Sequence, residues 1–142
     1  MTSIHFSFNS RDRLQTACQI AAKHYQAGNK LAVYCQDTSR LKAFDRMLWD
    51  YKRTAFVPHV GAQDPLAADT PVVLYAKPPA PGHDWVLNLD DECVPGAGDF
   101  GNIIEVVPAA ERDRAQGRAR WRAYQAAGHA IIQHDLAKND LP

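Results

Sequence analysis

The sequence predicts a three-layer α/β fold, with a mostly parallel (mixed) central sheet between helices, in a single domain over residues 1–142. A chain of 142 residues is long enough to bury a core of its own. Its first fifty residues alternate between strand and helix patterns, which favours parallel strands joined by right-handed crossovers. The short apolar run VVLYA (72–76) is typical of a strand buried on both faces, and WVLNL (85–89) predicts a further strand.

The first half of the chain supplies the clearest elements. Residues 3–9, SIHFSFN, alternate apolar and polar side chains, which predicts a strand with one buried face. A helix follows, with Ser10 as its expected N-cap. LAVYC (31–35) predicts a second, fully buried strand, and the next helix is expected to be capped by Thr38 or Ser39.

The second half is more broken by proline and glycine. Residues 54–60 are expected to form an edge strand or the start of a loop, and residues 92–94 could form a short strand. A strand is predicted at 102–108, followed by a long helix at about 109–127 that ends at Gly128. A last strand is predicted at 129–136, and about residues 136–142 are expected to form a loose tail.

Charge and composition narrow the class of protein. Lysine and arginine together number 16, as do aspartate and glutamate, so the formal net charge is zero. General nucleic-acid binders usually carry a basic excess, so only a local basic patch would suit DNA or RNA. The sequence contains no secretory signal pattern and no apolar run of membrane-spanning length, and its three cysteines are widely spaced. We therefore expect a cytoplasmic protein with reduced thiols and no membrane partner.

The long helix near the C-terminus carries the strongest candidate site. On a helical wheel four alanines share one face, which predicts close packing of that face on the sheet; they are Ala115, Ala119, Ala123 and Ala126. The opposite face gathers an indole among cationic side chains, namely Arg114, Arg118, Trp121, Arg122 and Gln125. The simple interpretation is a solvated helix whose Trp121 is covered by a loop. The functional interpretation is a binding surface.

Arginine and tryptophan together suit a ligand that combines negative charge with an apolar group. The planar guanidinium binds carboxylate or phosphate through paired donors, and the indole offers a stacking face. Two ligand classes fit, single-stranded nucleic acid or an acidic peptide that ends in an aromatic residue. The zero net charge favours the peptide.

Other motifs argue against catalysis and bound cofactors. GAGDFG (96–101) matches the pattern G-x-G-x-x-G, but it follows Pro95 and precedes a strand instead of opening a helix, so no functional dinucleotide site is expected. The acidic run Asp90–Glu92 is interpreted as a solvated loop, and the histidines lack zinc-site spacing, so no metal is expected. No catalytic constellation is recognisable, and we expect no cofactor.

A second apolar cluster surrounds the proline-limited segment. Large side chains gather between residues 48 and 60, among them Trp49, Phe56, Val57 and Pro58. They could form a corner of the core, or a contact with another protein.

Several ordered motifs resemble the chi subunit family of bacterial DNA polymerase III. They are HYQAGNKLAVYCQD, the LW at 48–49, FVPH at 56–59, NIIEVVP and RWRAYQAAG. The resemblance covers most of the chain and is weakest over 61–70, 78–83 and the tail. It implies a Rossmann-like fold that has lost nucleotide binding, and a non-catalytic replication adaptor in the clamp-loader assembly.

The resemblance also implies partners and the residues that contact them. One partner is the psi subunit, with the contact falling on Trp49, Phe56, Val57 and Pro58. The other is the acidic C-terminal tail of single-stranded DNA-binding protein, which ends in phenylalanine, and its contact falls on Val107, Arg114, Arg118, Trp121 and Arg122. An accessory helicase would compete for the psi surface, and single-stranded DNA would be reached indirectly. The rival hypotheses are a direct single-stranded DNA binder and a nucleotide-dependent enzyme.

Overall fold

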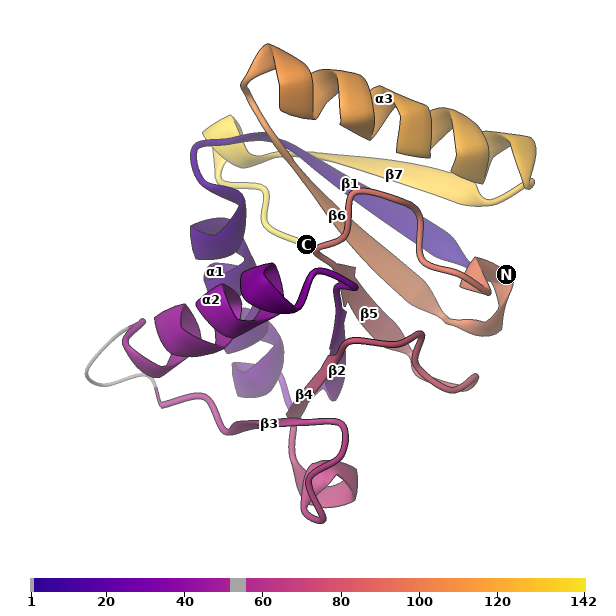
Figure 1. Cartoon of the computed structure of the whole chain (residues 1–142). Helices are drawn as coiled ribbons and strands as arrows, with labels where there is room; N and C mark the ends of the chain where they lie inside the picture. Colours follow the sequence, from indigo (N-terminus) through magenta and orange to yellow (C-terminus); the bar gives the residue numbers. More distant parts are fainter. Residues whose placement is uncertain (1, 52–55) are drawn as a thin grey trace.

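In a computed structural model, one seven-stranded sheet lies between helices on its two faces (Figure 1). The structure describes residues 2–51 and 56–142. The strands are β1 (Ser3–Ser10), β2 (Leu31–Tyr34), β3 (His59–Gly61), β4 (Val72–Tyr75), β5 (Trp85–Asn88), β6 (Asn102–Pro108) and β7 (Ala130–Asp135). The helices are α1 (Arg13–Gln26), α2 (Thr38–Trp49) and α3 (Glu111–Ala126), with short 3₁₀ turns η1 (Ala67–Asp69), η2 (Ala97–Asp99) and η3 (Leu136–Lys138). These elements confirm the predicted α/β class.

The sheet has the strand order β3-β4-β2-β5-β6-β1-β7, and every strand pair in it is parallel. The prediction of a partly mixed sheet was therefore wrong in that detail. Each strand is followed by a crossover rather than a hairpin, so the carboxyl ends of all strands meet at one edge. β1 is the second strand from one edge and lies between β6 and β7, the two strands that α3 connects.

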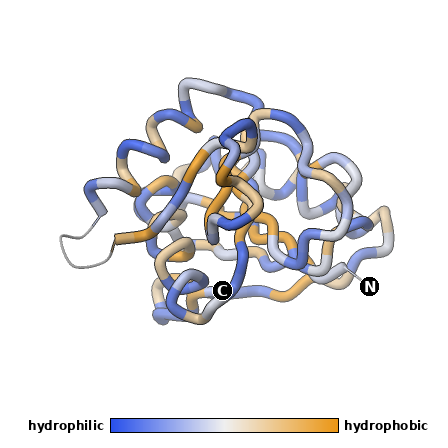
Figure 2. The backbone as a smooth tube through the Cα atoms, turned by 90° about the horizontal axis from the view of Figure 1, so that it is seen from below, coloured by the Kyte–Doolittle hydropathy of each residue, from blue (hydrophilic) through white to orange (hydrophobic). Residues whose placement is uncertain are grey.

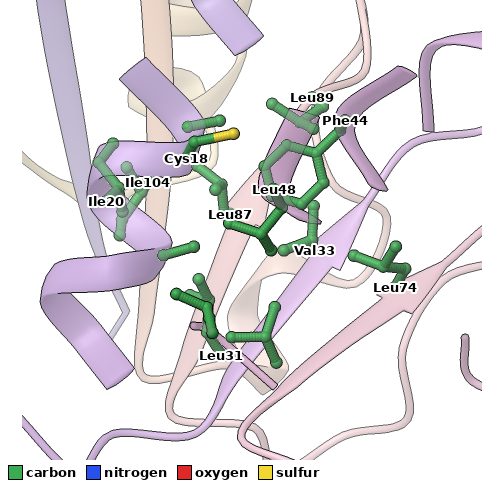
Figure 3. Close-up of a cluster of buried hydrophobic side chains, with 14 of the residues drawn as sticks. Cys18, Ile20, Leu31, Val33, Phe44, Leu48, Leu74, Leu87, Leu89 and Ile104 are labelled. Atoms are coloured by element: carbon green, nitrogen blue, oxygen red, sulfur yellow. The ribbon is translucent and has the colours of Figure 1, made fainter. Parts of the chain in front are cut away.

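Two hydrophobic clusters fill the space on either side of the sheet. The larger packs α1 and α2 against the strands, with Phe44, Leu48 and Leu87 among its fully buried side chains (Figure 3). The smaller lies under α3 and includes Phe6 and Tyr124. Figure 2 shows many of the hydrophobic segments gathered in the middle of the molecule, with hydrophilic segments common around its outside. These two layers of packing support the three-layer interpretation.

Both N-terminal helices begin with an aspartate cap, which corrects the sequence prediction. Asp12 accepts a hydrogen bond from the Gln15 amide and caps α1. Ser10 is buried instead, with its hydroxyl 2.8 Å from that of Thr16. α2 is capped by Asp37 and not by Thr38 or Ser39. A carboxylate at this position satisfies free amides and also complements the helix dipole.

The middle of the chain departs from the prediction in small ways. Part of the predicted 54–60 element lies outside the described residues, and the described part starts β3 directly after Pro58, at the edge of the sheet. The possible strand at 92–94 is a loop. The predicted loose tail is held in place, because Lys23 Nζ donates to the Leu141 carbonyl and His24 Nε2 lies 3.1 Å from the Pro142 oxygen.

Two further observations concern the helices and the cysteines. No helix among the described residues is both long and apolar enough to cross a membrane. The cysteines are free thiols, with Cys18 and Cys35 buried and Cys93 half-buried. Burial raises the pKa of the Cys18 thiol to about 12, which keeps it in its unreactive protonated form.

Candidate protein-binding site

A cavity of about 370 Å³ opens between α3 and the adjoining ends of β1 and β6. Its lining combines aromatic, aliphatic and cationic side chains from all three elements, and these are Phe6, Phe8, Asn9, Val107, Pro108, Ala109, Arg114, Gly117, Arg118 and Trp121. In an open parallel sheet, the carboxyl ends of the strands are the usual place for a ligand. This cavity lies at that edge.

Gly117 allows α3 to approach β6 closely at the cavity. A Cβ at this position would lie 2.9 Å from both Cγ atoms of Val107, which is closer than real side chains pack. At the other wall, Asn9 adopts a left-handed conformation (φ 65°) beside an irregularity in the β1 register. Its amide nitrogen donates to Asp135 Oδ1, which ties the end of β1 to β7. The cavity is therefore shaped by backbone features at both walls.

Aromatic rings form the floor of the cavity. Trp121 is half-buried, and its ring centroid lies 5.0 Å from that of Phe6 at an interplanar angle of 53°. Phe6 also meets Tyr124 edge-on at 6.1 Å. Tilted ring pairs at these separations are favourable and rigid. Trp121 is thus held by the core on one side while it lines the cavity.

Arginines form the charged rim. The side chains of Arg114 and Arg118 are about half exposed, at 58% and 49%, and both line the cavity. Glu111, at the start of α3, lies 3.0 Å from Arg118 Nη2 and 3.9 Å from Arg114 Nη1. Hydrogen bonding and charge from Arg118, with charge from Arg114, lower the pKa of the Glu111 carboxyl. The rim therefore already binds a carboxylate of its own chain.

A buried polar network fixes α3 on the sheet below this rim. Arg120 Nε donates to Glu105 Oε1 at 2.9 Å, and the Tyr124 hydroxyl donates to Glu105 Oε2 at 2.7 Å. Asn88 Nδ2 also donates to Glu105 Oε2, at 2.7 Å. Burial, together with the charge of Glu105, raises the pKa of the Tyr124 hydroxyl, so it stays a donor. The network sets the position of α3 relative to β6.

The buried face of α3 differs from the one that the wheel predicted. The alanine stripe 115, 119, 123 and 126 is exposed, and the helix packs through Gly117, Arg120 and Tyr124. The sequence did not predict that Arg120 would face the sheet, because its partner Glu105 lies in a strand whose other residues are mostly apolar. The arginine–tryptophan face therefore borders the packed face instead of lying opposite it, which explains how it helps to close a cavity.

Four of the five residues that the family resemblance implied for this surface line the cavity. Val107, Arg114, Arg118 and Trp121 come together, whereas Arg122 is exposed and lies outside the lining. Sequence reasoning missed Phe6, Phe8 and Gly117. The alternation in residues 3–9 had placed both phenylalanines on one face of the first strand, but no sequence signal showed that this face would lie under the helix.

The glycine motif and the acidic run occupy structural positions. Residues 96–101 form a 3₁₀ turn that leads into β6, at the amino end of that strand, where no α-helix begins. Asp90 accepts hydrogen bonds from the Gln36 amide and side chain, and Asp91 pairs with Arg40 at 3.1 Å. Among residues 2–51 and 56–142, no cluster of histidine, cysteine or acidic side chains could hold a metal ion.

A family model for the DNA polymerase III chi subunit, HolC, matches residues 1–132. The chain belongs to this family. Similar curated proteins are the DNA polymerase III subunit chi of Pseudomonas aeruginosa, 29% identical over 97% of this chain and 99% of its own length, and that of Escherichia coli K12, 27% identical over 80% and 79%. The subunit chi of Haemophilus influenzae Rd is 26% identical over 80% of this chain and 81% of its own length.

This chi-family chain also has an exposed aromatic patch beside β3, separate from the cavity. The rings of Trp49 and Phe56 lie 5.3 Å apart, and their side chains are 52% and 60% exposed. Trp49 also stacks at 4.4 Å on His59, whose Nε2 lies 2.8 Å from Asp45 Oδ1. The buried histidine holds Trp49 in place, so the exposed patch is rigid on one side.

Only some of the residues expected to contact the psi subunit are exposed at that patch. Trp49 and Phe56 are exposed and Pro58 is half-buried. Val57 is 2% exposed and packs in the core under α2, so its side chain does not offer a contact surface. The alternative interpretation of this segment as a core corner therefore holds for Val57.

Proposed function

We propose that this chain is a non-catalytic adaptor in bacterial DNA polymerase III, working in the cytoplasm between two protein partners. The α3 cavity would bind the acidic C-terminal tail of single-stranded DNA-binding protein. The Trp49–Phe56 patch would bind the psi subunit and so attach the chain to the clamp loader. The observation that carries the first assignment is an aromatic-floored cavity with two arginines on its rim.

The chemistry of the cavity fits a peptide that ends in phenylalanine. The terminal ring would lie against Phe6, Val107 and Trp121, which bury apolar area. Arg114 and Arg118 would pair with the terminal carboxylate and the preceding aspartates. Because a disordered tail is ordered on binding and the rim is half exposed, we expect affinity of about micromolar order that weakens with salt.

The exposed aromatic pair supports the psi assignment. Tryptophan is enriched among the residues that dominate protein–protein binding energy. Trp49 and Phe56 lie side by side at the edge of the sheet, well separated in sequence from the α3 cavity. An accessory helicase that uses the same patch would compete with psi, and DNA would be reached only through the coated strand.

Fluorescence anisotropy tests the tail assignment. The probes are a labelled acidic peptide ending in Asp-Ile-Pro-Phe, the same peptide without phenylalanine, and labelled oligo-dT. We expect binding to the first probe alone. Tight, salt-sensitive binding to oligo-dT would favour direct DNA binding through the arginines. A rise in melting temperature with nucleotides would favour the enzyme hypothesis.

Co-purification with the psi subunit of the same organism tests the second assignment. Trp49→Ala and Phe56→Ala are expected to lose psi, while peptide binding at the α3 cavity is retained. Leu66→Ala is the matched control, because Leu66 is 63% exposed but belongs to another loop. Retention of psi by both aromatic variants would contradict the assignment.

A further inference from the structure

Glu111 lies where it can bind both cationic groups of the cavity rim. It is the first residue of α3, and its side chain is 75% exposed. Residues 111, 114 and 118 follow one another along the same side of the helix, since their spacings are close to one and two turns. The Glu111 carboxylate consequently reaches Arg118 Nη2 at 3.0 Å and Arg114 Nη1 at 3.9 Å.

This contact uses the same chemistry that an acidic ligand would use. A guanidinium binds a carboxylate through a fixed set of donors, so each donor that faces Glu111 must be released before it can face a ligand carboxylate. In the unbound protein one donor of Arg118 is therefore hydrogen-bonded to Glu111, and Arg114 forms a longer ion pair with it. Glu111 itself is outside the cavity lining, so the apolar floor stays open while the rim is occupied.

We propose that Glu111 is an internal competitor that holds the arginine rim in the unbound protein and gives it up to the carboxylates of an acidic, aromatic-ended peptide. This inference rests on the proposed tail-binding function. Its consequence is specificity together with easy release. A ligand that offers only an aromatic group leaves the Glu111 contacts intact, whereas one that also offers carboxylates replaces them.

Two simpler roles for Glu111 make different predictions. An acidic residue in the first turn stabilises a helix through its dipole, and Glu111 could also hold Arg118 in a conformation that favours the ligand. In the first case its removal would leave peptide affinity unchanged. In the second case its removal would weaken binding. Competition predicts tighter binding after removal, and the matched variant below separates it from a general loss of negative charge.

The experiment compares Glu111→Gln with Asp113→Asn in peptide-binding titrations on the full chain. Asp113 is the other acidic residue in the first turn of α3, but it lines a separate hollow with Arg11 and Arg13. It therefore controls for helix dipole and overall charge. We expect Glu111→Gln to bind the acidic peptide about two- to fivefold more tightly at low salt, the range typical of an exposed ion pair. Asp113→Asn should bind within about 1.5-fold of the unchanged protein.

Two further arms identify the mechanism. At about 0.5 M NaCl the gain from Glu111→Gln should disappear, because exposed charge pairs are then screened. In an Arg118→Ala background most of the gain from Glu111→Gln should be lost, since the closer and hydrogen-bonded of the two contested arginines is gone. An unchanged or weaker affinity of Glu111→Gln at low salt overturns the proposal, as does a gain that is undiminished without Arg118.

Peptide binding by the unchanged protein distinguishes a failure of this inference from a failure of the proposed function. If it binds the peptide and Glu111→Gln binds no better, the tail site stands and the competitor role is wrong. If neither protein binds the peptide at any concentration up to about a thousandfold above the expected micromolar affinity, the tail site and the competitor role are both wrong.

Discussion

Single residues decide the shape and charge of the cavity. Val107 and Gly117 set the separation between α3 and β6, and Trp121 closes the floor. Arg118 and Arg122 are exposed arginines one helical turn apart, yet only Arg118 lines the cavity. Arg122 can therefore serve as the control for Arg118, because the two arginines lie on the same face of the helix.

Arg118→Ala and Trp121→Ala are each expected to weaken binding of the acidic peptide by about 1–3 kcal/mol, since both would be anchors of the ligand. Arg122→Ala, the matched control, should cost less than about 0.5 kcal/mol. Isothermal titration calorimetry measures all three variants. Equal losses for Arg118 and Arg122 would show that general charge, not the cavity, holds the peptide.

Gly117→Ala tests the close approach of helix and sheet. The added methyl would meet both Val107 methyl groups at 2.9 Å, so α3 must move away from β6. We expect the free energy of unfolding to fall by about 1 kcal/mol, because overpacking outweighs the better helix propensity of alanine. Peptide affinity should fall as well. Chemical denaturation and the same calorimetry check both, and a more stable variant with unchanged binding would contradict this account.

At the scale of elements, α3 is anchored by charge instead of by an apolar stripe. The helix was predictable as a helix, but its orientation was not, because Arg120 is buried against Glu105. A wheel built on the alanines assumes that apolar groups face inward. Here a buried ion pair between Arg120 and Glu105 faces the sheet, which is why the wheel misidentified the packed face.

Arg120→Met should be strongly destabilising, by about 3 kcal/mol, because it removes the hydrogen-bonded cation from the buried Glu105 carboxylate and leaves only Arg13, whose Nη2 is 4.0 Å away. Tyr124→Phe removes the hydrogen bond to the same carboxylate and also the one that the hydroxyl accepts from the Val94 amide, and it should cost about 1–3 kcal/mol. Thermal or urea unfolding measures both. Arg114→Ala, on the exposed rim, is the control and should stay within about 0.5 kcal/mol.

Across the whole molecule, strand order brings distant segments together. The sequence was sufficient for the alternating elements, the buried strands and the class of fold. It could not place β1 between β6 and β7, and so could not show that Phe6 and Phe8 line one cavity with Trp121, since this depends on the order of strands in the sheet. Nor did the polar tail sequence reveal its docking on α1.

That docking predicts a pH dependence of stability. His24 is 3% exposed, and its Nδ1 accepts from Asn29 Nδ2 while Nε2 donates to the Pro142 oxygen, so the ring is held neutral. Burial lowers the pKa of His24, and the charges of Lys23 and His5 lower it further, whereas the Pro142 contact raises it. The unfolded chain therefore takes up more protons, and stability should fall as pH drops below about 6.5.

Urea titrations between about pH 7.5 and 5 measure this effect. His24→Gln should show a shallower loss of stability over that range than the unchanged protein. Asn29→Ala should be destabilising near pH 7.5, and this cost should shrink as the pH falls far enough to protonate Nδ1, which then no longer accepts the hydrogen bond. Parallel pH profiles in all three proteins would show that His24 does not carry the dependence.

The most direct test of the tail-binding site is a backbone NMR titration of the ¹⁵N-labelled protein with the acidic peptide ending in phenylalanine. The account predicts that the largest shift changes fall on Phe6, Val107, Gly117 and Trp121, and that they are small when the phenylalanine is removed. Binding that shifts residues around Trp49 instead, or that leaves the amides of Val107 and Gly117 unchanged, would contradict it.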